Sequence, residues 1–446
     1  MAVNRRSFIR YASLAAAGNA LGLTPFGALN ALAQGTTDYK ALVCVFLYGG
    51  NDANNTIIPF DTAGYTNYAA VRGPLVLPQN TLLPLTPLPN FALNPNLPDV
   101  QSLFNNGTAA IVANVGTLVE PTTRAQYLAG QTVPINLFSH ADQQLEWQNA
   151  AQSSAMPTGW AGRIADALAT NYNASASIPM ITSVAGDTLF CNGVSSTPVS
   201  VSPGNLSGAS CSEGAACSAR LETAQALLSF SSGLTLVQAD NNITSNAYNY
   251  AKTLMDAVQS ISPLQTVFPS NNGLAAQLKQ IAQIIQVRSA LGVQRQIFFC
   301  GIGNFDTHAG QVTLQGNLLA QVSPALAAFY QATQELNVAS NVTTFTMSDF
   351  SRAYQPNSLL GSDHAWGSHH FVMGGAVKGG KMYGTFPTLA LGGPDDSGSN
   401  GRWVPSTGCV QYAATLAQWF GVSTSQLPAV FPTITNFGAN PILGFV

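Results

Sequence analysis

The sequence predicts an α/β fold with a doubly wound, mostly parallel sheet and a helical, loop-rich insertion. Near-continuous apolar runs rich in β-forming residues predict buried strands at 39–48, 109–115, 295–302 and 342–347. Carboxylate-bearing segments follow three of these runs directly, as is typical where parallel strands end at a ligand-binding edge. Helical periodicity between the runs supplies the helices that would cover the sheet.

The carboxylates that follow the strands are candidate metal ligands. The first run (YKALVCVFLY) passes through a Gly-Gly turn to Asp52, and the fourth run leads to Asp349. The third run leads to Asp306 and His308, whose spacing of two places both side chains on one side of an extended segment. We therefore expect one joint site. The structural alternatives are turn residues at Asp52 and Asp306 and a helix N-cap at Asp349.

The stretch 151–290 differs from the rest and predicts a cap or insertion. It opens a helix near Trp160 and then becomes rich in Ser, Gly and Asn over 193–219. Helical patterns follow at 219–230, 245–260, 274–290 and, beyond the insertion, 311–336.

Residues 1–33 are typical of a twin-arginine signal peptide. Arg5 and Arg6 precede an alanine-rich stretch, and Ala31-Leu32-Ala33 offers a cleavage site. We expect the twin-arginine translocase to export the chain, leaving residues 34–446 periplasmic or secreted. A short membrane anchor is the alternative, but glycines and a proline interrupt the stretch. No other run is long enough to span a bilayer, so we expect no stable membrane span after cleavage.

The composition excludes one large class of partners. Only 8% of residues are charged and the formal net charge is −3. Nucleic-acid binding needs a basic surface, so we expect no nucleic-acid partner.

Histidine is concentrated in carboxylate-rich motifs. The chain holds five histidines, each within two residues of an aspartate or another histidine. The densest group joins Asp363 and His364 to His369 and His370. Imidazole and carboxylate together suit zinc, manganese or iron, so we expect all four residues among metal ligands. Binding of a phosphate-like anion is the alternative, and spacing does not decide which of the last two histidines points inward.

The remaining catalytic candidates follow the second run. His140 could be a further ligand, a proton donor or the start of a helix capped by Ser139. Thr122 could attack a phosphorus or sulfur centre, with Arg124 stabilising the oxyanion. Ser139, Thr56 and a metal-bound water are rival nucleophiles, and a plain helix cap also explains Thr122.

Several motifs together resemble a known family. They are NRRSFIR, FLYGGNDANNTIIP, LFSHADQQ, GWAGR, FDTHAGQ, FTMSDFSR and DHAWGSHHFVMGGAVKGG. This combination is similar to the exported bacterial family catalogued as protein of unknown function 1501, and more distantly to the alkaline phosphatase and sulfatase superfamily. The resemblance implies an alkaline-phosphatase-like domain over 34–446. It also implies two divalent ions, with zinc expected first and manganese, iron or calcium as alternatives.

The superfamily pattern implies roles for individual residues. Asp52 resembles the first-strand ligand, and Asp349 resembles a later strand-end ligand that is followed here by Phe350. Asp306 and His308 resemble an Asp-x-x-x-His motif with shorter spacing. The segment around Thr122 is weakly similar to the sulfatase nucleophile segment but has no cysteine for a formylglycine.

These observations favour an exported, metal-dependent hydrolase of phosphate or sulfate esters, acting on a small-molecule or glycan ester. One alternative is a non-catalytic metal- or glycan-binding protein of the same fold in cell-surface assembly. Another is a transferase acting on an exopolysaccharide or a lipid head group.

Overall fold

A computed structural model describes residues 38–151, 156–204, 215–230 and 233–446. The expected signal peptide, residues 1–33, lies outside the described residues. The unit that carries the sheet spans Lys40–Val446.

Three parallel strands form the centre of the main sheet. They are β1 (Lys40–Leu47), flanked by β8 (Arg295–Ile302) and β9 (Val342–Ser348). The register pairs Leu47 with Ile302 on one side and with Ser348 on the other, so all three strands end at the same edge. Their apolar sequences are almost wholly buried, as expected for strands covered on both faces.

The sheet extends on both sides of this centre. Its order is β11-β5-β10-β9-β1-β8-β6-β7, with β12 paired to β5. Among these strands only β10 runs antiparallel to its neighbours. The predicted mixed, mostly parallel fold is therefore confirmed. The bounds are β5 (Ala109–Gly116), β6 (Ile181–Ser183), β7 (Val199–Ser200), β10 (Ser368–Met373), β11 (Met382–Tyr383) and β12 (Thr407–Gly408).

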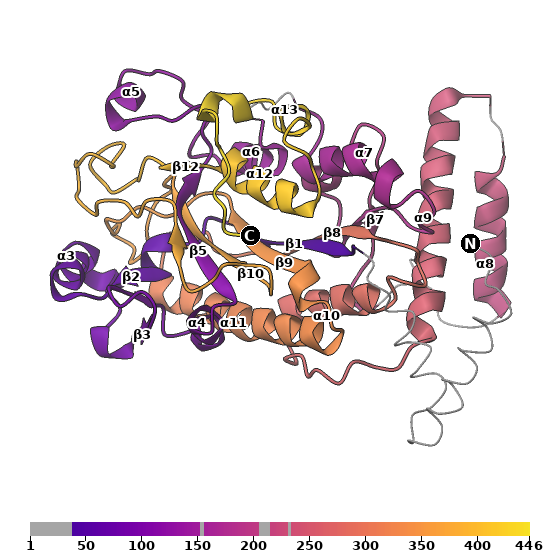
Figure 1. Ribbon diagram of the computed structural model, residues 1–446, viewed down its shortest axis with the longest axis horizontal. Coiled ribbons are helices and arrows are strands. Elements are labelled where there is room, and N and C mark those ends of the chain that lie inside the picture. Colours follow the sequence, from indigo (N-terminus) through magenta and orange to yellow (C-terminus); the bar gives the residue numbers. More distant parts are fainter. Residues whose placement is uncertain (1–37, 152–155, 205–214, 231–232) are drawn as a thin grey trace, which may run out of the picture. The chain divides into compact units, whose positions relative to one another are not determined.

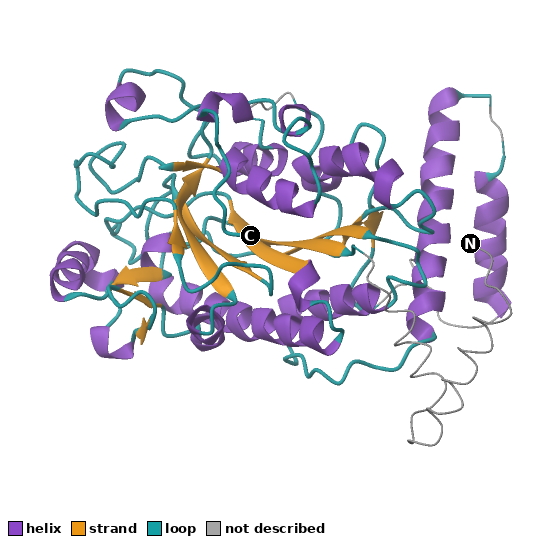
Figure 2. Ribbon diagram, in the orientation of Figure 1, coloured by secondary structure: helices purple, strands orange, loops and turns teal. Residues whose placement is uncertain are grey.

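Helices cover both faces of the sheet (Figures 1 and 2). One layer contains α6 (His140–Asn149), α7 (Trp160–Tyr172) and α12 (Cys409–Phe420). The opposite layer contains α4 (Pro98–Asn105), α10 (Gly273–Gln286) and α11 (Gln311–Glu335). Each helix buries an apolar stripe against the sheet, which gives the doubly wound arrangement its core.

The stretch 151–290 is divided between the sheet and a helical hairpin. It supplies β6 and β7 to the sheet and α7 and α10 to its two faces. Two further helices, α8 (Ala215–Leu228) and α9 (Thr235–Gln259), contact each other as a hairpin. This hairpin is the part of the stretch for which we keep the proposal of a cap or insertion.

Smaller elements complete the structure. A second sheet has the order β2-β4-β3. The bounds of these elements are β2 (Ile57–Pro59), β3 (Leu83–Pro84), β4 (Phe91–Leu93), α3 (Thr62–Arg72), α5 (Arg124–Leu128), α13 (Leu427–Val430), η1 (Ala53–Asn55), η2 (Gly73–Leu75), η3 (Gln79–Thr81), η4 (Leu189–Cys191), η5 (Ala339–Asn341) and η6 (Ile434–Phe437). Within the described ranges, every helix is too short or too polar to cross a bilayer.

Candidate metal centre

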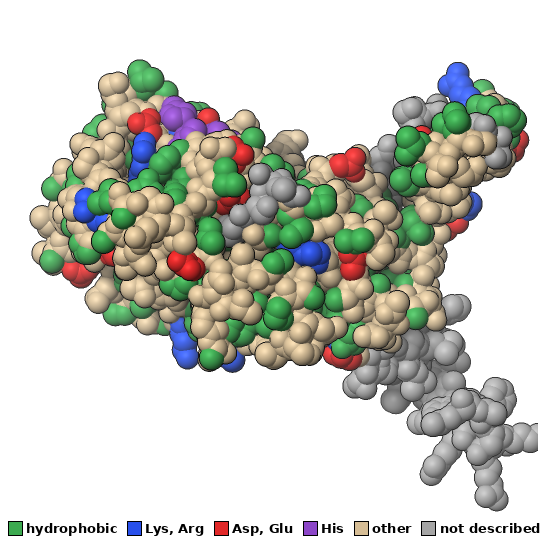
Figure 3. Space-filling model, turned by 90° about the horizontal axis from the view of Figure 1, so that it is seen from above, with side chains coloured by type: hydrophobic (Ala, Val, Ile, Leu, Met, Phe, Trp, Pro, Cys, Tyr) green, Lys and Arg blue, Asp and Glu red, His purple; other side chains and the backbone are tan. Residues whose placement is uncertain are grey.

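A cluster of histidines and aspartates lies at the edge where β8 and β9 end. Asp306 and His308 follow β8, and Asp349 follows β9. His364 precedes β10, which runs antiparallel and therefore begins at this same edge. His140 is the first residue of α6. Figure 3 shows histidine side chains together at the surface, beside acidic and basic side chains.

Glycines let the segments of this cluster approach one another closely. Gly49 has φ +111°, and a Cβ there would collide with the backbone nitrogen of Asp306. A Cβ on Gly361 would collide with the backbone of His308. These positions therefore require glycine, which brings the turn after β1 and the segment before His364 against the loop after β8.

Asp306 lies between the histidines. Its Oδ1 is 3.1 Å from Nε2 of His308 and 3.4 Å from Nε2 of His364, and these two nitrogens are 2.9 Å apart. Its Oδ2 is 3.4 Å from Nε2 of His140. The two carboxylate oxygens thus face different imidazoles.

His140 is held by Asp349. Its Nδ1 lies 2.7 Å from Oδ2 of Asp349, whose side chain is completely buried. Asp349 also accepts hydrogen bonds from Gln144 Nε2 at 2.8 Å and from Gly49 N at 3.1 Å. With Nδ1 fixed in this way, Nε2 of His140 faces Asp306, and it is buried without a hydrogen-bond partner in the described residues. The hydrogen bond that His140 donates to Asp349 also raises the pKa of His140, against the opposing effect of burial.

His364 and His308 are oriented in a similar way. Nδ1 of His364 is 2.7 Å from the carbonyl oxygen of Phe138. Because a carbonyl only accepts, Nδ1 carries the proton and Nε2 presents its lone pair to the cluster. Burial lowers the pKa of His364, which favours this neutral form. Nδ1 of His308 is 3.4 Å from Oδ1 of Asp363.

Arg352 holds Asp306 in its ionised form. Its guanidinium is completely buried and donates from Nη1 to Asp306 Oδ1 at 2.7 Å. Burial of Asp306 opposes ionisation, but the hydrogen bond and charge of Arg352 outweigh it and lower the pKa of Asp306. Arg352 also donates to the carbonyl oxygen of Ser362, which fixes the segment that leads to His364.

The donor set fits a divalent transition metal. Tetrahedral ligands at 2.0–2.1 Å from zinc lie about 3.3 Å from one another. Neighbouring donor atoms of Asp306, His308 and His364 are separated by 2.9 to 3.4 Å. One ligand atom from each of His140, Asp306 and His364 can be chosen so that all three lie within 4.8 Å of one another. The His140 atom available for this purpose is Nε2, which is buried, faces Asp306 and has no hydrogen-bond partner among the described residues.

A comparison with protein families tests the family resemblance that the sequence motifs indicated. Residues 39–397 match the family described as protein of unknown function (DUF1501). The chain belongs to this family. No curated protein matches this DUF1501 member.

Solved structures are similar to this DUF1501 member at low identity. Ps i-CgsB is 10% identical with a TM-score of 0.35, over 90% of this chain and 77% of that chain. The lipoteichoic acid synthase LtaP from Listeria monocytogenes is 8% identical with a TM-score of 0.33, over 86% and 72%. A variant of the alkaline phosphatase PafA is 12% identical with a TM-score of 0.27, over 71% and 63%.

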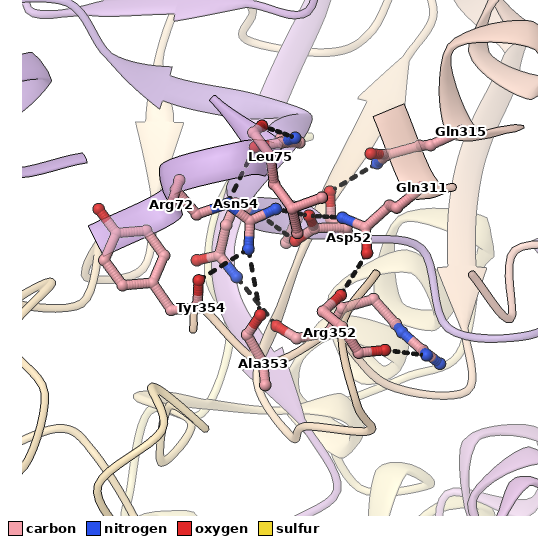
Figure 4. A network of polar contacts seen from close by, with 12 residues as sticks. Asp52, Asn54, Arg72, Leu75, Gln311, Gln315, Arg352, Ala353 and Tyr354 are labelled. Carbon is pink, nitrogen blue, oxygen red and sulfur yellow. Dashed lines mark hydrogen bonds and ion pairs between the residues drawn. The ribbon is translucent and has the colours of Figure 1, made fainter. Parts of the chain in front are cut away.

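The structure places Asp52 of this DUF1501 member in a separate, buried network (Figure 4). Its Oδ2 accepts from Arg72 and from Gln311, and its Oδ1 accepts from Asn54 N at 3.0 Å. Arg72 also donates to the carbonyl oxygens of Ala353 and Tyr354, which directly follow Arg352. Asp52 therefore supports the segment that carries Arg352 and makes no contact with the histidine cluster within the described ranges.

His369 and His370 are also apart from the cluster, because both belong to β10 and are almost completely buried. Nδ1 of His369 accepts from Asn114 N at 2.9 Å, and its ring stacks on Phe386. The ring of His370 packs against Trp147. Burial lowers the pKa of each histidine to about 3, so both are neutral core residues in this DUF1501 fold.

The predicted hydroxyl nucleophiles serve local structure. Thr122 donates to the carbonyl oxygen of Glu120 at 2.8 Å, and Ser139 caps α6 by accepting from Asp142 N. Arg124 donates to the carbonyl oxygens of Asp396 and Gly398.

Two residues of the centre were missed by the sequence reasoning. Arg352 lies three residues after Asp349, within the polar segment that follows β9. Gln144 lies one helical turn after His140, on the same face of α6. In each case the short spacing from a predicted site residue is the sequence feature that could have indicated a role at the centre.

Proposed function

We propose that this protein is a metal-dependent hydrolase of phosphate or sulfate esters. A divalent ion would be bound by His140, Asp306, His308 and His364. The observation that carries the proposal is the orientation of His140. A buried carboxylate holds one ring nitrogen while the other points, unpartnered, at Asp306. Carboxylate–histidine pairs of this kind orient metal ligands in proteins.

The residues around the ligands define their state. Asp349 orients His140, the carbonyl of Phe138 selects the tautomer of His364, and Arg352 keeps Asp306 ionised. A divalent metal at this place would polarise an ester and make water a stronger nucleophile. Asp306 and His308 are 44% and 42% exposed, so a soluble ester can reach the centre.

We propose water as the attacking group. The hydroxyls of Thr122 and Ser139 are engaged in local turns and caps. In the part of the chain that the structure describes, no serine or threonine hydroxyl is hydrogen-bonded to Asp306 or to the imidazoles of His140, His308 and His364.

Charge favours one ion over the two that the superfamily resemblance implies. Asp306, Asp349 and Asp363 lie against the histidines, and Arg352 is the guanidinium that contacts Asp306. Three carboxylates against one guanidinium leave two formal negative charges, which one divalent ion neutralises. A second ion would leave excess positive charge, which an anionic substrate would have to balance.

The biological setting is part of the same proposal. Residues 1–33 would direct export by the twin-arginine translocase, and the enzyme would act in the periplasm or outside the cell on a small-molecule or glycan ester.

The first experiment measures metal content by mass spectrometry on protein purified without added metal or chelator. Asp306→Ala and His364→Ala are compared with the parent, and Asp256→Ala, a change on an exposed residue of α9, is the control. We expect about one equivalent of zinc, manganese or iron in the parent and the control, and little in the two site variants. Aryl phosphates and aryl sulfates are then assayed for turnover.

The outcomes separate the candidate functions. Metal-dependent release of phosphate or sulfate supports the hydrolase. Stable metal binding without turnover favours a binding or assembly protein. Absence of bound transition metal in the parent contradicts the metal centre.

A further inference from the structure

We propose that Arg402 binds the negatively charged group of the substrate beside the metal centre. This inference rests on the proposed function, because it assigns the recognition of the anionic ester to a residue outside the ligand set.

Within the described residues, the side chain of Arg402 has no hydrogen-bond acceptor. Its guanidinium carbon lies 4.5 Å from the centroid of the Phe138 ring, and its Nε is buried without a hydrogen-bond partner in the described residues. Six other arginines in the described part of the chain donate side-chain hydrogen bonds to carbonyl or carboxylate oxygens. They are Arg72, Arg124, Arg163, Arg288, Arg295 and Arg352. An ionised donor without an acceptor is unfavourable when buried, and stacking on an aromatic ring supplies only part of the missing interaction.

The ring under Arg402 belongs to the segment that builds the centre. The carbonyl oxygen of Phe138 accepts the hydrogen bond from His364. His140 is two residues further along the chain, so its Cα lies within about 7 Å of the Cα of Phe138. Arg402 therefore stacks on a residue that contacts one proposed ligand and nearly adjoins another.

The loop that carries Arg402 is fixed by Asp396. This carboxylate is completely buried and accepts from the backbone nitrogen of Arg402 at 3.1 Å and from that of Gly401 at 2.9 Å. Arg124 donates from Nε to the carbonyl oxygen of Asp396 at 2.6 Å. Arg124 is thus occupied in holding the loop, and Arg402 is the cation placed to bind an anion.

The chemistry of the guanidinium indicates the ligand class. Stacking uses one face of the guanidinium plane and does not use the N–H groups at its edge. A planar fork of donors matches the oxygens of phosphate and sulfate, to which arginine forms paired hydrogen bonds. The single negative group of a phosphate or sulfate ester is the ligand that this arrangement fits.

The experiment measures binding of inorganic phosphate by calorimetry and the kinetics of aryl ester hydrolysis, on the metal-loaded full chain. Arg402→Gln removes the charge, and Arg402→Lys keeps the charge but loses the planar fork. Arg220→Gln, on the exposed surface of α8, removes the same charge elsewhere. Metal content and the melting temperature are recorded for each variant.

We expect Arg402→Gln to weaken phosphate binding roughly tenfold or more and to raise KM similarly, with kcat and metal content close to those of the parent. Arg402→Lys should recover part of the affinity, and Arg220→Gln should match the parent.

Two results would overturn the inference: a parent that binds no phosphate, or an Arg402→Gln variant that binds it as tightly as Arg220→Gln. Either can occur while metal binding and turnover persist, in which case the proposed function stands. Another outcome is a parent that binds phosphate but takes up no metal. If Arg402→Gln then loses phosphate binding, the anion site is supported and the metal centre is contradicted.

Discussion

A substitution at Asp349 tests whether His140 is oriented for metal binding, because Asp349 contacts His140 but is not itself one of the proposed ligands. The substitution Asp349→Asn keeps the size of the side chain and removes its charge. Oδ2 now accepts from His140 at 2.7 Å and from Gln144 at 2.8 Å, while Oδ1 accepts from Gly49 N at 3.1 Å. An asparagine has one acceptor oxygen, so its amide nitrogen must face at least one of these donors.

The size of the expected effect follows from the lost orientation of His140. Partners that hold a metal-binding histidine contribute about 10- to 100-fold to metal affinity. This range corresponds to about 1.4–2.7 kcal/mol. The hydrogen bond to an ionised acceptor, at about 1.5–3 kcal/mol, gives a similar magnitude. We therefore expect the zinc dissociation constant of Asp349→Asn to rise by one to two orders of magnitude.

Competition with a chromophoric chelator at neutral pH measures this constant. Asp61→Asn is the matched control, because Asp61 caps α3 and asparagine caps helices equally well. Circular dichroism confirms that each variant is folded. A zinc affinity of Asp349→Asn within twofold of the parent and of Asp61→Asn would refute the role of Asp349 in orienting His140.

Three further predictions concern stability, measured by urea unfolding. Arg72→Met leaves Asp52 buried without its cation, and we expect a loss of about 3–5 kcal/mol that Asp52→Asn in the same chain partly restores; an unchanged midpoint would contradict this. Burial raises the pKa of Glu146 to about 7, so its protonated form stabilises the fold at acid pH and this contribution is lost as pH rises from about 4.5 to 7. Glu146→Gln should therefore gain about 3 kcal/mol over the parent at pH 8 and little at pH 4, and equal differences at both pH values would argue against it. Gly162→Ala places a Cβ against the backbone of Asn192, and we expect it to lower the free energy of unfolding by more than about 1 kcal/mol. A smaller loss would show that the structure relaxes around this contact.

The sequence was sufficient to predict the fold class and the edge of the sheet at which the candidate metal centre lies. The apolar runs at 39–48, 295–302 and 342–347 became β1, β8 and β9 with nearly the predicted bounds. Strands covered on both faces need continuous apolar sequence, and this local requirement is visible without the structure. The polar residues that follow β8 and β9 meet because parallel strands end at one edge.

The extent of the sheet could not be read from the sequence. Strands β6, β7, β11 and β12 have two or three residues each. Such short elements have no periodicity to detect, and they become strands only because a neighbouring strand offers its backbone donors and acceptors.

What each polar residue does was also decided by the tertiary structure. Asp52 and Asp349 follow strands of the same sheet in similar contexts, yet Asp52 pairs with Arg72 of α3 and Asp349 contacts His140 of α6. The role of a carboxylate depends on the cation or donor that a distant segment brings to it.

The sequence by itself determined which residues stand at the functional edge, and the tertiary structure decided which of them face one another. His369 and His370 resemble ligands in the sequence, but β10 lies between β5 and β9 and its two faces are covered, so both imidazoles are buried. His364 lies before β10 begins, and its ring reaches Asp306. The physical reason is that burial and partner choice are set by contacts between segments far apart in the chain, and a local pattern does not contain them.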